Sequence, residues 1–152
     1  MKKIYLLLTL ACLMTGISGC SKDGDNWQKN QFLHGSYRME ITQTGDIASF
    51  RVITSLNGGN GLNNGIFNEQ GEDLGASYRL TDEENRRSTY SYHTADNGII
   101  MIFTQLATCD DPGKSMTTKV KVYFNGKLID TKESTFKGTD TSPFQVSWSQ
   151  IK

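Results

Sequence analysis

Residues 119–130 read KVKVYFNGKLID, and this stretch carries the clearest evidence for a fold class. Val120, Val122 and Phe124 alternate with residues that include two lysines. An alternation with a period of two is typical of a β-strand that buries one face and exposes the other. The stretch therefore predicts a strand that ends at Phe124.

The two residues after this strand predict a tight turn. Asn125 and Gly126 both tolerate the positive φ angles of a type I′ turn, which joins the two strands of a β-hairpin. A two-residue loop also fixes the register of the strands. The predicted pairs are Phe124 with Lys127, Val122 with Ile129, and Lys121 with Asp130.

The same alternation recurs along the rest of the chain. The further stretches that show it are 37–41, 50–52, 74–80, 90–92 and 144–148. Turn-forming Gly, Asn, Asp and Pro residues separate them. Several short strands with turns between them are typical of a sandwich or a barrel. We therefore expect an all-β fold, an antiparallel two-sheet sandwich, with a lipocalin-like closed barrel as the alternative.

The helix signal in this domain is short. Thr81 followed by Glu84 fits a capping box, in which each side chain accepts a hydrogen bond from the other residue's backbone. No apolar stripe follows these residues, so we expect a helix of one or two turns at most.

The run Ile99–Phe103 is apolar on both faces, unlike the alternating strands. We expect a central strand that loops of the same domain cover, with a bound ligand or a docked partner as the alternatives. Asp111-Pro112-Gly113-Lys114 places Pro and Gly at the two central positions of a type II turn. That turn would join the run to a strand near Met116 as a second hairpin.

The first nineteen residues have the features of a secretory signal peptide. Lys2 and Lys3 precede an apolar run over residues 4–14, and small residues follow it. The next residues, Ile17-Ser18-Gly19-Cys20, resemble the lipobox of bacterial lipoproteins. The resemblance implies cleavage before Cys20, a diacylglycerol thioether on Cys20, and a fatty acyl group such as palmitate on the new amino terminus. It also implies an outer-membrane protein held by this lipid anchor.

The residues after the lipobox suggest where the anchored protein faces. Ser21-Lys22-Asp23-Gly24-Asp25 resembles the short acidic export signal of small Bacteroides-type surface lipoproteins, which implies exposure at the cell surface. The same residues also suit a flexible tether. We therefore expect a signal peptide over 1–19, a lipidated cysteine and tether over 20–26, and a single β domain over 27–152.

Composition excludes several classes of protein. After loss of Lys2 and Lys3 the mature chain has fourteen basic and sixteen acidic residues, a formal charge of −2 that does not suggest nucleic-acid binding. Cys12 leaves with the leader and Cys20 is acylated, so Cys109 has no partner for a disulfide. The domain must therefore fold without disulfides.

Two groups of residues are candidates for ligand binding. The loop NGGNGLNNG at 57–65 matches neither a dinucleotide fingerprint nor a calcium loop, and we expect a surface loop there. The amides of Asn60, Asn63 and Asn64 could instead face a ligand. Tyr90 and Tyr92 share a strand face and could stack on sugars, although aromatic residues in this pattern more often pack in a core.

No catalytic or metal-binding pattern is visible. Cys109 and the histidines His34 and His93 show no nucleophile or zinc spacing, so we expect no enzyme activity, no metal and no cofactor. The predicted function is a membrane-anchored binding or accessory module for a glycan or a protein. The alternatives are a lipocalin-like carrier of a hydrophobic ligand, a structural subunit of a surface complex, and a hydrolase whose carboxylates converge only in the fold.

Overall fold

The structure is a computed structural model that describes residues 32–59 and 65–150. The predicted signal peptide, the lipobox with Cys20, the tether, and Asn60, Asn63 and Asn64 lie outside the described residues. Within the described residues, no helix is long and apolar enough to cross a membrane.

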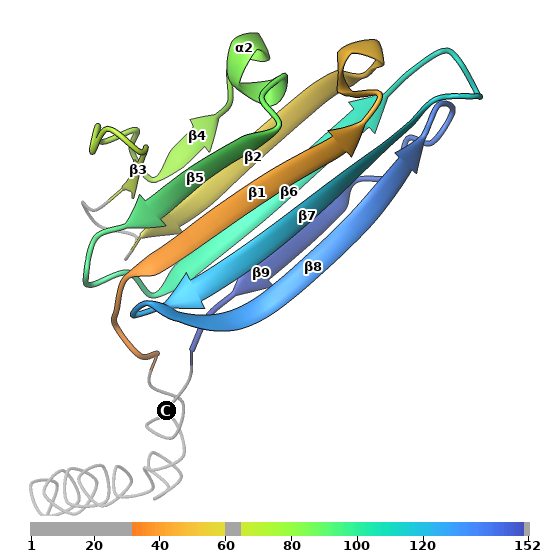
Figure 1. The fold of residues 1–152 in the computed structure, drawn as a ribbon. Helices are drawn as coiled ribbons and strands as arrows, with labels where there is room; N and C mark the ends of the chain where they lie inside the picture. The colour runs from red at the N-terminus through yellow and green to blue at the C-terminus, as the bar shows by residue number, and fades with distance from the viewer. Residues whose placement is uncertain (1–31, 60–64, 151–152) are drawn as a thin grey trace, which may run out of the picture. The chain divides into compact units, whose positions relative to one another are not determined.

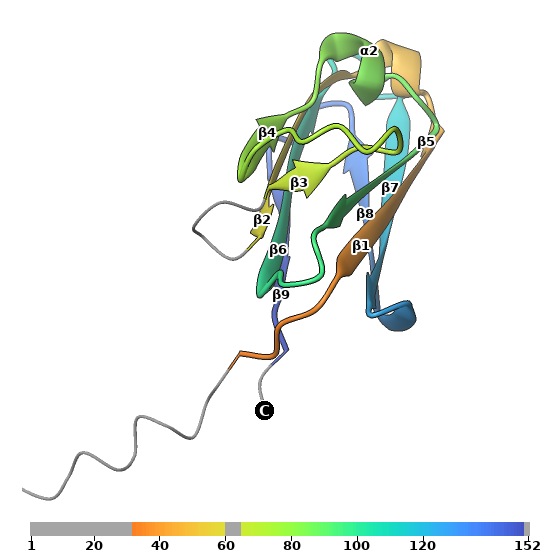
Figure 2. The same ribbon diagram turned by 90° about the vertical axis from the view of Figure 1, so that its left-hand side faces the viewer.

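The described residues form two antiparallel sheets that pack face to face (Figures 1 and 2). One sheet has the order β3-β5-β1-β7-β8, and the other has the order β4-β2-β6-β9. The strands are β1 (Tyr37–Gly45), β2 (Arg51–Gly59), β3 (Ile66–Phe67), β4 (Ser77–Arg79), β5 (Thr89–Thr94), β6 (Ile100–Thr108), β7 (Ser115–Phe124), β8 (Lys127–Lys137) and β9 (Phe144–Trp148). The two short helices are η2 (Ile47–Ser49) and α2 (Asp82–Asn85). The predicted all-β sandwich is confirmed, and the two sheets remain separate instead of closing into a barrel.

Alternation explains how the strands build the core. Tyr37, Met39 and Ile41 of β1 are fully buried or nearly so, while the residues between them face outward. Val52 and Leu56 of β2 face the same interior, with Thr54 between them in phase. In β2 the inward residue Thr54 is polar and the outward residue Ile53 is apolar. The alternation of apolar and polar residues is therefore not visible in the sequence of this strand.

A layer of polar side chains crosses this core. The side-chain amide of Gln105 donates to Gln43 Oε1 at 3.2 Å and to Thr54 Oγ1 at 3.0 Å. Thr118 Oγ1 donates to Gln105 Oε1 at 2.6 Å. These four residues come from β1, β2, β6 and β7, and each is at most 1 % exposed. Since buried polar groups cost free energy unless they are paired, the layer strongly favours one arrangement of the two sheets.

The predicted hairpin forms, but its register shifts. Asn125 and Gly126 have φ angles of 49° and 78°, as a type I′ turn requires, and Phe124 pairs with Lys127. A β-bulge between Val122 and Tyr123 then makes Val122 pair with Asp130. The predicted pairs beyond the turn, Val122 with Ile129 and Lys121 with Asp130, are therefore wrong. A bulge adds one residue to one strand, which alternation in the other strand cannot reveal.

Four residues of the Ile99–Phe103 run, from Ile100 onward, form the start of β6, a central strand as predicted. Met101 and Phe103 are fully buried, while Ile100 and Ile102 are half-buried on the outer face. The predicted second hairpin is wrong, because β6 and β7 belong to different sheets and residues 109–114 cross between them.

The predicted turn at 111–114 forms with a different geometry. Lys114 N–H donates to the Asp111 carbonyl at 3.2 Å, which closes a β-turn. A type II turn requires a positive φ at Gly113, and Gly113 has none. The hydrogen-bonded turn is therefore present, while the predicted type is wrong.

The predicted capping box is present at the start of α2. Thr81 Oγ1 accepts from Glu84 N–H at 3.2 Å, and Glu84 Oε2 accepts from Thr81 N–H at 2.7 Å. The helix ends after one turn, at Asn85, as its lack of an apolar stripe predicts.

Candidate functional site

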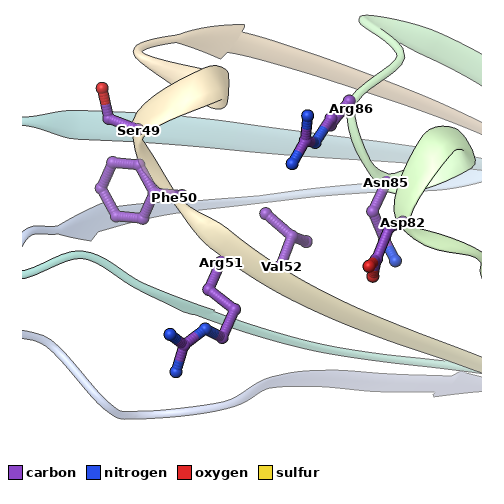
Figure 3. A pocket seen from close by; sticks show the side chains of 7 residues that line it. All are labelled: Ser49, Phe50, Arg51, Val52, Asp82, Asn85 and Arg86. Carbon is purple, nitrogen blue, oxygen red and sulfur yellow. The ribbon is translucent and has the colours of Figure 1, made fainter.

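A hollow of about 270 Å³ lies between the start of β2 and α2 (Figure 3). It exists because β4 has three residues and pairs with β2 over residues 55–57, so the first residues of β2 have no strand beside them on this side. We call it the α2 pocket. It is lined by Ser49, Phe50, Arg51, Val52, Asp82, Asn85 and Arg86.

The lining of the α2 pocket consists of a buried floor and an exposed rim. Phe50, Val52 and Asn85 are between 3 % and 8 % exposed and form the floor. The exposed rim consists of Ser49, Arg51, Asp82 and Arg86. The floor is part apolar and part polar, and the rim is polar, so the lining suits a polar ligand better than a hydrophobic one.

The charged groups of the rim are available to a ligand. In residues 32–59 and 65–150, the side chains of Arg51, Arg86 and Asp82 make no ion pair and no hydrogen bond with one another or with other described residues. Figure 3 shows the Arg86 guanidinium reaching from the end of α2 toward the start of β2, while Arg51 extends on the other side of the strand. The rim therefore offers two cations and one carboxylate.

A smaller hollow of about 110 Å³ adjoins the α2 pocket. It shares Ser49 and Arg51 with that pocket and is completed by Thr108, Cys109 and Asp110. Cys109 is a free thiol of intermediate exposure, and its Sγ accepts from Asp111 N–H at 3.4 Å. Arg51 thus borders a hollow on each side.

Glu84 links the two sheets beside α2. Tyr78 of β4 donates its hydroxyl to Glu84 Oε2 at 2.8 Å, and Tyr92 of β5 donates to Glu84 Oε1 at 3.0 Å. Burial, together with the Glu84 carboxylate, raises the pKa of Tyr78 to about 12. Burial alone would raise the pKa of Glu84, but hydrogen bonds from Thr81, Tyr78 and Tyr92 outweigh it and lower that pKa.

A second carboxylate links the sheets on the opposite side of the sandwich. Asp130 of β8 accepts from Trp148 Nε1 of β9 at 2.9 Å. This hydrogen bond is the main reason that the pKa of Asp130 is lowered. Because β8 and β9 are edge strands of different sheets, Asp130 and Glu84 each join the sheets at one open side.

Tyr90 and Tyr92 lie inside the sandwich, where they are 3 % and 2 % exposed. Their rings meet edge to face, with centroids 6.0 Å apart. The Tyr90 hydroxyl is buried beside Thr54 and Gln105, and no atom of the described residues completes a hydrogen bond with it. The pair therefore presents no ring to solvent on which a sugar could stack.

The residues considered for catalysis are not brought together. His93 stacks on Phe67 near the start of β1, with ring centroids 5.5 Å apart, whereas Cys109 follows β6 at the other end of the sandwich. His34 lies near the same end as His93, with Nδ1 3.3 Å from the Asn97 carbonyl oxygen. Among the described residues, no three His, Cys, Asp or Glu side chains gather as metal ligands would.

The α2 pocket is the part of the site that the sequence did not predict. Its residues come from 49–52 and 82–86, two segments with no shared motif. The capping box of Thr81 and Glu84 did predict the short helix that follows Thr81. Nothing in the sequence showed that this helix would stand beside the start of β2, on the side that β4 does not reach.

Comparisons with known proteins found similar solved structures, while no protein-family model and no curated protein matches the chain. A domain of unknown function, DUF4425, from Bacteroides vulgatus is 26 % identical, with a TM-score of 0.68 over 80 % of this chain and 100 % of that chain. The chain is similar to DUF4425 proteins.

Two further structures agree with this likeness. A DUF4425 family protein from Bacteroides ovatus is 22 % identical, with a TM-score of 0.59 over 78 % of this chain and 96 % of that chain. A protein from Parabacteroides distasonis, solved by NMR in its calcium-bound form, is 25 % identical, with a TM-score of 0.64 over 76 % of this chain and 93 % of that chain. The sandwich is thus a fold found in Bacteroides and related bacteria.

Proposed function

We propose that the chain is a lipid-anchored protein of the outer membrane whose sandwich binds an acidic glycan in the α2 pocket without changing it chemically. The anchor is Cys20, on the resemblance of Ile17-Ser18-Gly19-Cys20 to a lipobox. The observation that carries the binding role is the pocket itself, with its buried floor and its unpaired charged rim.

The chemistry of the rim favours an acidic sugar. A guanidinium donates paired hydrogen bonds to a carboxylate or sulfate, and Arg86 has no other partner among the described side chains. Asp82 and Ser49 can accept hydrogen bonds from sugar hydroxyls. At about 270 Å³ the pocket is just below the usual range for drug-sized ligands, which suits a single sugar unit.

A non-enzymatic role agrees with what surrounds the pocket. No residue of its lining is a histidine or a cysteine, and Asp82 has no second carboxylate beside it in that lining. The two Bacteroides neighbours are described as of unknown function, with no activity named. A carrier of hydrophobic ligands is not favoured, because the sheets do not close into a barrel and the pocket rim is charged.

The proposal can be tested with one substitution and one matched control. Arg86→Ala should weaken binding of uronic-acid or sulfated oligosaccharides about tenfold or more, because a charge-assisted hydrogen bond contributes roughly 1.5–3 kcal/mol. Arg79→Ala removes an exposed arginine of β4 outside the pocket lining and should leave the affinity unchanged. Isothermal titration on both variants, with thermal melts to check folding, gives the comparison.

Two results would count against an acidic glycan. One is equal loss of affinity in Arg86→Ala and Arg79→Ala, which would point to general surface charge. The other is binding of no glycan by the wild-type protein in an array, combined with recovery of one defined surface protein by crosslinking near Arg86. That result would favour the alternative of an interaction subunit.

Calcium does not fit the described residues. The acid-rich loop after β3 uses its oxygens internally, since Asn68 Oδ1 accepts from the backbone N–H groups of Gln70 and Glu72. Asp73 Oδ1 accepts from Gly75 N–H, and no group of three potential ligands forms in the described segments. The calcium of the Parabacteroides protein is therefore not assigned to this chain.

A further inference from the structure

The large apolar side chains that are most exposed in the described residues gather at one end of the sandwich. They are Phe32, Leu33 and Leu128, which are 47 %, 36 % and 47 % exposed. We call this end the apolar base. Single exposed apolar residues are common on protein surfaces, but three at one end call for an explanation.

Hydrogen bonds fix the apolar base in space. Leu33 N–H donates to the Gln150 carbonyl at 2.7 Å, so both ends of the described chain meet there. Asn125 N–H donates to the Ser36 carbonyl at 2.8 Å, and Ser36 N–H donates to Asn125 Oδ1 at 2.9 Å. The turn that precedes Leu128 is thereby held beside the start of β1.

Figures 1 and 2 show α2 at one end of the domain and the start of β1, with the turn between β7 and β8, at the other end. The α2 pocket and the apolar base therefore lie at opposite ends. β1 runs from the base at Tyr37 to the pocket end at Gly45. Nine residues of strand span about 30 Å at roughly 3.3 Å per residue. Anything that holds the base therefore leaves the pocket free.

We propose that the apolar base rests on the lipid bilayer, so that the α2 pocket points away from the membrane. The inference rests on the proposed anchor at Cys20, which joins the domain at Phe32, inside the base. Eleven residues lie between Cys20 and Phe32, and the twelve steps along the chain from one to the other reach at most about 40 Å. The tether thus keeps the domain near the bilayer, and contact between the apolar base and the lipid determines which end of the domain faces the bilayer.

The charges near the apolar base are mixed, so they favour contact with an anionic membrane surface only weakly. Lys127 is exposed beside Leu128, and a lysine at a lipid interface can place its stem among acyl chains and its ammonium among headgroups. The exposed Asp96 lies at the same end and carries the opposite charge. The apolar side chains, more than net charge, therefore carry the contact.

The test uses the mature protein, from position 20 onward, reconstituted in phosphatidylcholine–phosphatidylglycerol vesicles. A Cys109→Ser background leaves one reactive thiol when Lys127→Cys or Glu83→Cys is introduced. An environment-sensitive NBD probe at position 127 should shift its emission to the blue and be quenched by doxyl-labelled lipid, whereas a probe at position 83 on α2 should do neither. Phe32→Ser with Leu33→Ser should abolish the effect at position 127.

The outcomes separate this inference from the function on which it rests. Protein that fails to float with the vesicles would mean that the anchor is absent. Floating protein whose two probes both report water would overturn the apolar base as a membrane contact. A probe at position 127 that is already shifted without vesicles would mean that another segment of the chain covers the base, which also overturns it.

Discussion

Glu84 shows how one side chain can serve a helix and two sheets. Its carboxylate accepts from the backbone and hydroxyl of Thr81, and also from Tyr78 and Tyr92. The sequence predicted the capping box because Thr and Glu stand three positions apart. It could not predict the tyrosines, since their approach depends on how β4 and β5 face each other in the fold.

We expect Glu84→Gln to lower the free energy of unfolding at pH 7 by about 1–3 kcal/mol, because the amide offers the tyrosines one acceptor oxygen in place of two charged ones. The folded-state pKa of Glu84 lies below its ordinary 4.5. Its ionised form therefore stabilises the fold above about pH 4.5, and this stability is lost as the pH falls through the lower folded-state pKa. Urea unfolding at pH 7 and pH 3 should show the difference from wild type shrinking in acid.

Glu83→Gln is the matched control for this prediction. Glu83 is exposed, stands in the same helical turn, and its side chain makes no hydrogen bond within the described part of the chain. It should change stability by less than about 0.5 kcal/mol at either pH. A Glu84→Gln variant that is equally destabilised at pH 7 and pH 3 would contradict the role of the charge.

At the scale of elements, the bulge in the β7–β8 hairpin has a structural consequence. It leaves Ile129 as an extra residue in β8 and sets Asp130 opposite Val122. Asp130 then accepts from the indole of Trp148 in the other sheet. The register predicted from the Asn125-Gly126 turn would have left Asp130 in an exposed pair with Lys121, so the bulge makes the contact between the sheets.

Asp130→Ala should therefore destabilise the domain by about 1–3 kcal/mol, because the Trp148 N–H loses its acceptor in a mostly buried position. Asp130→Asn keeps an acceptor oxygen and should recover part of this loss. Glu133→Ala breaks the Lys119–Glu133 ion pair, whose side chains are 46 % and 50 % exposed, and should cost at most about 1 kcal/mol. Urea unfolding of the three variants checks the order; equal costs for Asp130→Ala and Glu133→Ala would contradict it.

The elements also show where sequence patterns reach their limit. Alternation located β1, β5, β7 and β9, because every second residue of each strand is fully or partly buried and most of these residues are apolar. It failed to show that β6 and β7 lie in different sheets, since a crossover and a hairpin can use the same turn residues. It also gave no sign of the α2 pocket, which depends on where β4 stops along β2.

At the scale of the whole molecule, polar contacts set how the sheets face each other. The Gln43–Gln105–Thr54–Thr118 layer lies in the middle, and Glu84 and Asp130 close the two open sides. Apolar packing is tolerant of sliding, whereas hydrogen bonds hold at one geometry. The two ends of the sandwich therefore differ, with the α2 pocket at one end and the apolar base at the other.

The difference between the two ends matters for function only if a lipid anchor holds the chain on a membrane. A substitution at Cys20 tests for that anchor. We expect Cys20→Ala to move the protein from the membrane to the soluble fraction and to stop incorporation of labelled palmitate, because several acyl chains at about 0.8 kcal/mol per buried methylene hold a protein on a bilayer. Cys109→Ala removes the thiol of the folded domain and should leave both properties unchanged. Wild-type protein that takes up no labelled fatty acid, or Cys20→Ala protein that still sediments with membranes, would show that the bilayer is reached by some means other than a thioether at position 20.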